Sequence, residues 1–573
     1  MNNGKSPGSD GITTEFYKIF WKDIKTYLIN SLNYSFQQSQ LTEIQTQSII
    51  TLLPKHGKDP TFLENWRPIS LLNIDYKIAS KSIANRLKNV LESIISPSQT
   101  GFIKGRYIGE NIRLLCQMLE HVDDNHLSSI IFFADFEKAF DSVDHEFMFK
   151  TFKHFNFGDS FLKWLKLFYK DAQSSVTNNG HLTDFFPIQR GVRQGCPLSP
   201  YVFITCIELL SNCISKNNNI KGIKMSETEV KQTLFADDGT FITDGSKTSF
   251  ENLIHTLDNF AKISGLKLNT KKCNILRTGL PQKNNITYMP EKNFTWNTDS
   301  AKTLGINFRA TTRGMLKDNL EPKILEFTNC LKSWQHRKLS LLGKIAVIKT
   351  FALPKLIYPL TVLPKPSDQT INLIKSKMYE FIWNKKPDKI KRKLLTHSYE
   401  EGGLKMIDID KFIHALKASW IKRIFDENNK GIWKEKYLDQ IDKYGGKLLF
   451  QCNLSNKDIK QMFAKDLFLQ ELINAWHGIY RNENKTVRSQ IIWNNKEIRV
   501  GENTIFYENW YNRGLQYLEQ IYDFRVGRFF NFQTFQEIYD IPANDFLKYN
   551  QLLSSIPKIW KNSIKNERRP SKL

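Results

Sequence analysis

Three aspartates stand where two short apolar stretches of the sequence end. The run 129–134 ends at Asp135, and the run 234–236 ends at the pair Asp237 and Asp238. If the two stretches become strands of one sheet, the three carboxylates meet within a few ångströms, where like charges raise a carboxyl pKa unless a cation compensates them. Oxygen ligands without His or Cys favour Mg²⁺, and a pair of such ions activates an attacking hydroxyl and stabilises a leaving oxygen in phosphoryl or nucleotidyl transfer. The pattern therefore predicts metal-assisted chemistry on a phosphate ester.

A second acidic pair lacks this context. Asp123 and Asp124 lie in a polar stretch with no apolar run before them, which predicts a solvated loop. The pair at 237 and 238 is instead followed by Gly239. Because glycine adopts positive φ readily, we expect a tight turn there that exposes both carboxyls.

An α+β scaffold is needed to bring these aspartates together. Apolar runs predict strands at 49–53 and 129–134, and 234–243 has the pattern of a strand, a tight turn and a strand. Amphipathic spacing predicts helices over 15–45, 75–95, 145–170, 198–215 and 249–264. After about residue 280 the periodicity becomes mostly helical, at 315–350 and 368–384, and a less regular tail follows.

The composition favours a nucleic-acid partner. The chain of 573 residues predicts two to four domains, and 82 Lys and Arg against 58 Asp and Glu give a net charge of +24, which suits a polyanion. The densest basic cluster is 389–393. Seven scattered cysteines without a C-x2-C pair argue against a disulfide scaffold or a Cys-rich zinc site and favour a reducing intracellular compartment. No apolar run reaches the roughly 18–20 residues of a membrane span, and the N-terminus shows no secretory segment.

The aspartate stretches resemble the catalytic blocks of reverse transcriptases. Phe235-Ala-Asp-Asp238 is similar to their Y/F-x-D-D signature, 134–143 resembles their first catalytic block, and 193–200 is close to the pattern of non-LTR (LINE-type) retrotransposons. Further blocks follow in the order of that family, at 4–11, 65–71, 264–272, 302–305, 334–343 and 402–423. The sequence is therefore identified as a member of this family.

The resemblance implies an α+β right-hand polymerase with fingers, a palm built on an antiparallel sheet, and a thumb, followed by a basic and mostly helical extension. The expected domains are an N-terminal extension over 1–45, fingers and palm over 46–283, a thumb over 284–370 and a basic C-terminal region over 371–573. Elements of this family place an endonuclease ahead of the first block, which here begins at residue 3. The chain is therefore expected to be the polymerase portion without that nuclease.

The resemblance also assigns roles near the aspartates. Asp135, Asp237 and Asp238 would hold two Mg²⁺ ions, with Mn²⁺ as a substitute, and the backbone carbonyl of Phe136 would add an oxygen ligand. Phe140 would abut the incoming sugar and exclude a 2′-hydroxyl; the alternative is an ordinary core residue.

Five further residues would contact the nucleotide and the template. Lys55 and Arg67 would clamp the triphosphate, because such cations bind phosphate oxygens, or else they are surface charges. Gln194 and Gly195 would contact the template and the nascent base pair, or else form an ordinary turn. Lys272 would protonate the leaving pyrophosphate, although the lysine before it leaves this assignment open.

The implied activity is RNA-directed DNA synthesis that copies retrotransposon RNA from a primer 3′-hydroxyl, primed at target DNA. The implied partners are template RNA, primer DNA and deoxynucleoside triphosphates, with no membrane and an open oligomeric state. The implied location is the nucleus, after a cytoplasmic ribonucleoprotein stage. Two alternatives stay open, a reverse transcriptase like those of group II introns and a decayed copy that only binds RNA.

Overall fold

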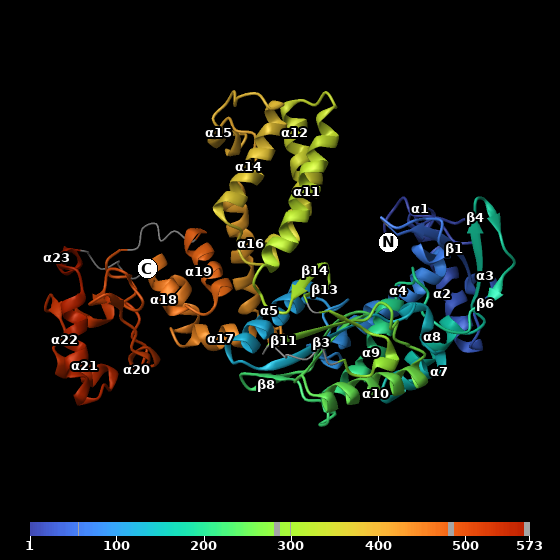
Figure 1. The fold of residues 1–573 in the computed structure, drawn as a ribbon, viewed down its shortest axis with the longest axis horizontal. Helices are drawn as coiled ribbons and strands as arrows, with labels where there is room; N and C mark the ends of the chain where they lie inside the picture. The colour runs from blue at the N-terminus through green and yellow to red at the C-terminus, as the bar shows by residue number, and fades with distance from the viewer. Residues whose placement is uncertain (56, 280–286, 298, 480–485, 567–573) are drawn as a thin grey trace. The chain divides into compact units, whose positions relative to one another are not determined.

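The chain folds into two compact units. The computed structural model describes residues 1–55, 57–279, 287–297, 299–479 and 486–566. The first unit contains 1–315 and 430–432, and the second contains 316–429 and 433–573 (Figure 1). The predicted bounds of fingers, palm and thumb stay predictions.

A five-stranded sheet forms the centre of the first unit. Its order is β12-β11-β3-β10-β9. The middle strand β3 (Ser128–Ala134) is antiparallel to β10 (Asp238–Thr243) on one side and to β11 (Asn274–Gly279) on the other. The outer strands are β9 (Gln232–Phe235) and β12 (Thr295–Asn297). Six of the seven residues of β3 are buried, as its uninterrupted apolar sequence predicts for a central strand.

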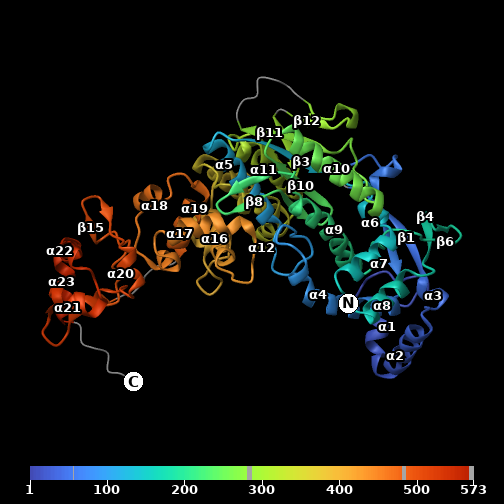
Figure 2. The same ribbon diagram turned by 90° about the horizontal axis from the view of Figure 1, so that it is seen from below.

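Helices pack around this sheet and complete the core. They are α4 (Ile74–Ile94), α5 (Ile108–Asp124), α9 (Ser199–Lys216) and α10 (Lys247–Ser264). Figure 2 shows α9 and α10 beside β3 and β10. One hydrophobic cluster joins Phe132 of β3 and Phe203 of α9 with Phe250 of α10. Three of these helices, α4, α9 and α10, match predicted ones, and α5 adds a helix over a stretch where only a solvated loop at 123–124 was predicted. That pair is exposed, as predicted, but it ends a helix.

A second sheet has the order β2-β1-β4-β5, with β6 also paired to β4. The strands β1 (Gln47–Pro54) and β2 (Trp66–Leu72) form an antiparallel pair, and β4 (Gln173–Asn178) runs parallel to β1. The short strands β5 (His181–Leu182) and β6 (Phe186–Pro187) pair with β4.

Two helices expected to be continuous are interrupted. The stretch 15–45 divides into α1 (Thr14–Ile19), α2 (Trp21–Gln38) and α3 (Glu43–Thr46), because Ser39 adopts φ 56° and Thr42 begins a new helix with a capping box. The stretch 145–170 divides into α7 (His145–His154) and α8 (Asp159–Tyr169), since Asn156 adopts φ 59° and Gly158 is extended. The other elements of this unit are α6 (Ala139–Ser142), β7 (Ile223–Met225), β8 (Thr228–Val230), β13 (Ser300–Thr303) and β14 (Ile306–Arg309).

The second unit begins with a helical bundle. Its helices are α11 (Met315–Gln335), α12 (Leu341–Val347), which continues through a π-helical turn at 348–352, α13 (Pro354–Val362), α14 (Asp368–Trp383), α15 (Arg392–Thr396) and α16 (Ile409–Ile424). Figure 1 shows α12 and α15 at the same end of this bundle. The buried Lys344 links α12 to α14 by donating hydrogen bonds to the carbonyl of Ile382 and to the side chain of Asn384. The first bond gives a partner to a backbone carbonyl in the last turn of α14, which has none within the helix.

The stretch predicted as a less regular tail contains several helices and buried tryptophans. The helices are α17 (Glu435–Asp442), α18 (Asn456–Met462), α19 (Leu467–Ile479), α20 (Glu508–Asn512), α21 (Phe532–Tyr539), α22 (Phe546–Ser555) and α23 (Lys558–Asn566). Two hairpins accompany them, β15 (Arg499–Val500) with β16 (Asn503–Thr504) and β17 (Tyr522–Asp523) with β18 (Arg528–Phe529). Trp433, Trp493 and Trp510 are fully buried.

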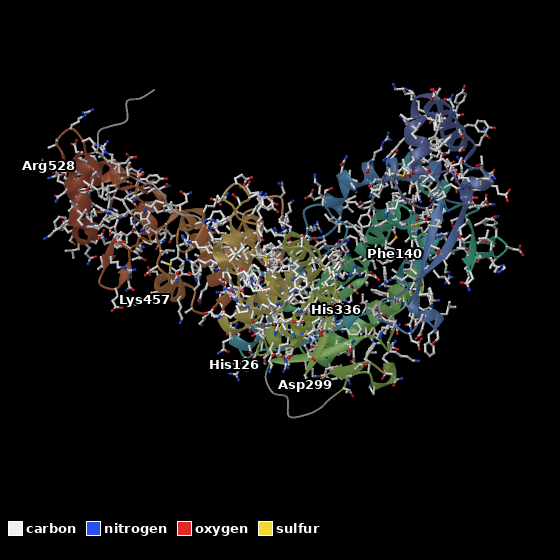
Figure 3. All side chains as sticks on the ribbon, turned by 90° about the horizontal axis from the view of Figure 1, so that it is seen from above. His126, Phe140, Asp299, His336, Lys457 and Arg528 are labelled. Carbon is white, nitrogen blue, oxygen red and sulfur yellow. The ribbon has the colours of Figure 1, made fainter. Side chains whose placement is uncertain are left out.

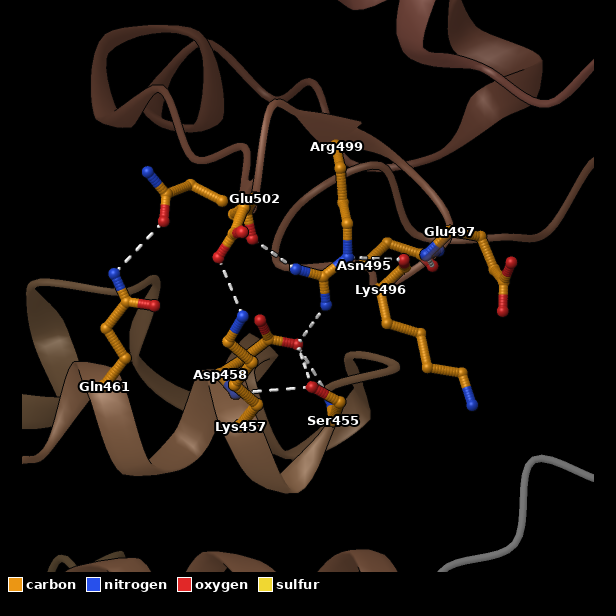
Figure 4. Close-up of polar contacts among 10 residues, drawn as sticks. Ser455, Lys457, Asp458, Gln461, Asn495, Lys496, Glu497, Arg499 and Glu502 are labelled. Carbon is orange, nitrogen blue, oxygen red and sulfur yellow. Dashed lines mark hydrogen bonds and ion pairs between the residues drawn. The ribbon is translucent and has the colours of Figure 1, made fainter.

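A buried carboxylate joins α18 to the β15–β16 hairpin. Asp458 accepts hydrogen bonds from the Ser455 hydroxyl at 2.6 Å and from Arg499 Nη2 at 2.7 Å (Figure 4). Asp458 is 4% exposed, so its carboxylate is shielded from water although Arg499 is partly exposed, whereas both partners of the neighbouring pair Lys457–Glu502 are exposed. Among the residues that the structure describes, no single helix is long and apolar enough to cross a bilayer, and one bent pair, 341–352 with 354–362, meets that test by length and composition.

Candidate active site

The register of the central sheet brings the three predicted aspartates to one edge. Gly239 of β10 lies opposite Ala134, the last residue of β3, so Asp135 and the start of β10 adjoin. Asp238 pairs with Phe235, and Asp237 lies in the turn that joins β9 to β10. The expected meeting of two strand ends, about a hundred residues apart in sequence, is confirmed.

The positive φ of this turn lies at Ala236, where it is 56°. Gly239, which was expected to provide it, lies within the strand β10, so that prediction was wrong. A left-handed conformation is uncommon for a residue with a Cβ and persists only where its surroundings enforce it. Ala236 is buried, and its backbone N–H and carbonyl both bond to the Gln99 side chain.

The three carboxyls influence one another electrostatically. Partial burial and the charge of Asp135 raise the pKa of Asp237. Partial burial, followed by the charges of Asp237 and Asp135, raises the pKa of Asp238 to about 6. Burial also raises the pKa of Asp135, while the positive charges of Lys272 and Lys55 oppose that rise. The site thus holds more negative charge than its own cations neutralise.

This donor set fits a hard divalent cation. It offers carboxylate oxygens without a His or Cys ligand, and their mutual repulsion is what a bound cation would relieve. As they stand, no three acidic, His or Cys side chains among the described residues lie close enough together to hold a metal ion. Cys273 does lie behind Asp135, with its Sγ 3.5 Å from the Asp135 backbone nitrogen, and burial raises the pKa of this thiol to about 11.

Phe136 lies directly beyond the first aspartate. It is buried and forms an isolated antiparallel bridge with Leu268. The two hydrogen bonds of this bridge run from Asn269 N to the Asp135 carbonyl and from Glu137 N to the Lys267 carbonyl. The Phe136 carbonyl takes no part in these two bonds, and its assignment as an oxygen ligand stays a prediction.

Phe140, labelled in Figure 3, is partly buried and packs against the hydrophobic cluster of the first unit. Its ring stacks on Phe203 of α9 with centroids 4.3 Å apart and an angle of 18° between the planes. Its backbone carbonyl accepts a hydrogen bond from Val192 N at 2.6 Å. The ring is half-buried, so it is held by the core on one side and retains accessible surface on the other. Its predicted role as a sugar gate stays a prediction.

Gln194 and Gly195 form a turn against β2. Ser70 N donates a hydrogen bond to the Gln194 carbonyl at 2.8 Å. Gly195 has φ 118°, and a Cβ there would lie 2.4 Å from the Ser70 carbonyl oxygen, so only glycine fits. Gln194 Nε2 donates to Asp141 Oδ1 at 3.2 Å. Sequence reasoning missed Asp141, since its only local signal is a charge placed directly after Phe140.

The predicted cations have different positions. Lys55 lies at the end of β1, where its ammonium donates to the Glu64 carbonyl at 2.8 Å. Arg67 is exposed on β2 and pairs with Leu53. Lys272 is exposed after the turn at Asn269. Of the positive charges near Asp135, the charge of Lys272 lowers the pKa of that aspartate the most. The assignment of Lys272 as the proton donor to pyrophosphate stays a prediction.

Asp135 directly follows β3, and Asp237 and Asp238 lie where the antiparallel neighbour β10 begins, an arrangement that fits the palm of a nucleotidyl-transfer polymerase. Residues 53–308 match the family described as reverse transcriptase (RNA-dependent DNA polymerase). The chain is 30% identical over 429 residues, 74% of its length, to the transposon TX1 uncharacterized 149 kDa protein of Xenopus laevis, of which the match covers 32%. It is 25% identical over 370 residues, 62% of its length, to the Pol polyprotein from the type-2 retrotransposable element R2DM of Drosophila melanogaster, of which the match covers 33%.

Residues 53–308 are therefore a reverse transcriptase domain of the kind found in non-LTR retrotransposons. The chain spans about a third of the length of these curated relatives. Among solved structures, the apo telomerase of Candida tropicalis matches with a TM-score of 0.38 and 14% identity, over 81% of this chain and 74% of that one.

Proposed function

We propose that this chain copies RNA into DNA by transferring deoxynucleotides to a primer 3′-hydroxyl. The observation that supports this most directly is the meeting of Asp135 with Asp237 and Asp238 at one sheet edge within a reverse transcriptase domain. The pKa shifts of these carboxyls add support, because groups tuned by burial and by a specific charge partner are typical of catalytic sites.

The three aspartates would hold two Mg²⁺ ions, or Mn²⁺ in their place, with the Phe136 carbonyl as a further ligand. When bound, such ions make a primer hydroxyl more acidic and neutralise charge on a departing pyrophosphate. The carboxylates would orient the reacting ends, since each lies at a strand end or in the tight turn between two paired strands.

The surrounding residues would bind the nucleotide. Lys55 and Arg67 on the β1–β2 hairpin would hold the triphosphate, and Lys272 would donate a proton to the pyrophosphate oxygen as its bond to the α-phosphate breaks. The exposed part of the Phe140 ring would lie where a ribose 2′-hydroxyl has to fit, which favours deoxynucleotides. Gln194 and Gly195 would position the template base.

The substrates would be template RNA, primer DNA at a nicked target, and deoxynucleoside triphosphates. The net charge of +24 supports this proposal, because Lys and Arg bind phosphate backbones and release their counterions. By analogy with the family, we propose a nuclear site of action after assembly with RNA in the cytoplasm.

A primer-extension assay on an RNA template with Mg²⁺ tests this proposal. Asp237→Asn should abolish extension, because it removes a charged ligand, while RNA binding stays within about twofold of wild type since binding rests on cations. Asp123→Asn is the matched control, an acidic pair member exposed at the end of α5, and should extend normally. Wild-type chain that binds RNA without extending primers would leave only an RNA-binding function.

A further inference from the structure

The segment between α4 and α5 lies along the free edge of β9. Leu234 N donates to the Ser98 carbonyl at 2.8 Å, and Thr100 N donates back to the Leu234 carbonyl at 2.9 Å, with Gln99 opposite Leu234 in a parallel bridge. The side chain of Asn111 adds a bond to the same carbonyl at 2.9 Å. The last strand before the catalytic turn is therefore hydrogen-bonded on both edges.

Gln99 extends this pairing into the turn itself. Its Oε1 accepts a hydrogen bond from Ala236 N at 2.9 Å, and its Nε2 donates to the Ala236 carbonyl at 3.3 Å. The same Oε1 accepts from Gly101 N at 2.8 Å, which fixes the orientation of the amide. One side chain thus bonds both backbone groups of the residue that carries the positive φ and directly precedes Asp237.

The hydrogen bonds of Gln99 are shielded from water, and the segment that carries it is anchored. Gln99 is 1% exposed and Ala236 is 5% exposed, so water cannot replace these bonds. A Cβ at Gly101 would lie 2.5 Å from Ala236 N, so the two backbones approach each other as closely as glycine allows. Arg106 anchors the segment by donating to the carbonyls of Ile95, Ser96 and Gln99 at 2.9, 2.5 and 2.5 Å.

We propose that Gln99 is a positioning residue for the catalytic aspartates. By fixing the left-handed conformation of Ala236, it sets the direction in which the backbone presents Asp237 and Asp238 to the edge where Asp135 ends β3. This inference rests on the proposed function, because it concerns the same site. Gln99 does not contact substrate; it acts through the backbone of the turn.

A positioning role of Gln99 differs from a merely structural one in its effect on the Mg²⁺ dependence of the activity. Gln99→Leu keeps the volume of the side chain but leaves Ala236 N and Gly101 N without their acceptor, so the turn can relax to an ordinary φ. The aspartates then lose their common orientation, and a displacement of about 1 Å can cost roughly 100-fold in rate. We therefore expect a large fall in kcat, a higher Mg²⁺ concentration for half-maximal activity, and a nearly unchanged KM for the nucleotide.

Gln117 of α5 provides a matched control. It is the same residue type with the same 1% exposure, and its side-chain amide has no hydrogen-bond partner among the described residues. Gln117→Leu should therefore leave kcat and the Mg²⁺ dependence unchanged. Gln99→Glu retains an oxygen that can accept from Ala236 N and Gly101 N but loses the Nε2 donor, and it should fall between Gln99→Leu and wild type.

The experiment compares the full-length chain and these three variants in primer extension with Mg²⁺ titration, in thermal unfolding, and in Mn²⁺ binding followed by loss of the free-ion EPR signal. The expected result is that Gln99→Leu weakens Mn²⁺ binding about tenfold or more at a melting temperature similar to that of Gln117→Leu. Unchanged Mn²⁺ affinity, or a loss of activity that only follows the unfolded fraction, would overturn the proposal. Wild type that binds Mn²⁺ without extending primers would refute the polymerase function, while the Mn²⁺ comparison would still decide the role of Gln99.

Discussion

The buried carboxyl of Glu208 should make the stability of the first unit depend on pH. Glu208 of α9 is 2% exposed and accepts a hydrogen bond from the Ser96 hydroxyl at 3.1 Å. Burial raises its pKa to about 7, against a smaller lowering by Ser96 and Arg106. In an unfolded chain the pKa of this group would lie near its ordinary value of 4.5. Between these two values the folded protein holds a proton that the unfolded chain has released.

This difference in pKa determines whether the free energy of unfolding rises or falls with pH. Below the unfolded pKa both states are protonated and the group has no effect; as the pH rises toward the folded pKa, unfolding releases the proton and the free energy of unfolding falls. The full difference of pKa corresponds to about 3 kcal/mol, and about 2–3 kcal/mol of it develops between about pH 5 and about pH 8. Glu208→Gln is neutral at every pH and should remove this pH dependence.

Pulse proteolysis in urea measures the unfolding free energy of the first unit for wild type and variant at both pH values. Glu208→Gln should gain about 2–3 kcal/mol relative to wild type on going from the lower to the higher pH. Glu146→Gln is the control, because the ion pair of Glu146 with Lys150 is exposed, and this variant should leave the pH dependence unchanged. A wild-type minus variant difference that does not change with pH would refute a protonated, buried Glu208.

Three further predictions concern other parts of the chain. Arg499→Met should lower the unfolding free energy of the second unit by about 2–3 kcal/mol in urea, because it leaves the buried Asp458 without its cation. Lys457→Met at the exposed neighbouring pair should leave it unchanged. Phe140→Ala should admit ribonucleotides, measured as the ratio of kcat/KM for deoxy- and ribonucleotides; an unchanged ratio would exclude a gate. Replacing the three lysines of 389–393 by glutamine should reduce the slope of log affinity for RNA against log salt by about 0.7 for each phosphate that the protein no longer neutralises, and an unchanged slope would place the RNA elsewhere.

Local sequence signals predicted the strands that carry the aspartates. The uninterrupted apolar run before Asp135 is typical of a central strand, and the structure places it in the middle of the sheet. The turn after β9 was predicted correctly, but the wrong residue was expected to adopt positive φ. Gly239 offered the local signal for positive φ, but the constraint comes from Gln99, 137 residues away in sequence, which holds Ala236 in that conformation. A tertiary hydrogen bond over that separation leaves no pattern in the local sequence.

The same limit applies to single charges. Sequence alone could not choose between Lys271 and Lys272, because both follow the same turn, and the charge of Lys272 lowers the pKa of Asp135 without deciding which lysine meets pyrophosphate. Asp141 was missed because a lone acidic residue is usually a surface charge, and only its hydrogen bond with Gln194 distinguishes it. The helix breaks near Ser39 and Gly158 were also missed, because the amphipathic spacing of apolar residues continues across a short interruption.

The close approach of Gly195 to Ser70 has a consequence for engineering. Because no side chain fits between residue 195 and the β2 backbone, the segment 193–200 and the β1–β2 hairpin pack together only when their shapes are complementary. Chimeras that graft this hairpin from a relative should therefore keep the fold of the first unit only when the donor's loop is transferred with it.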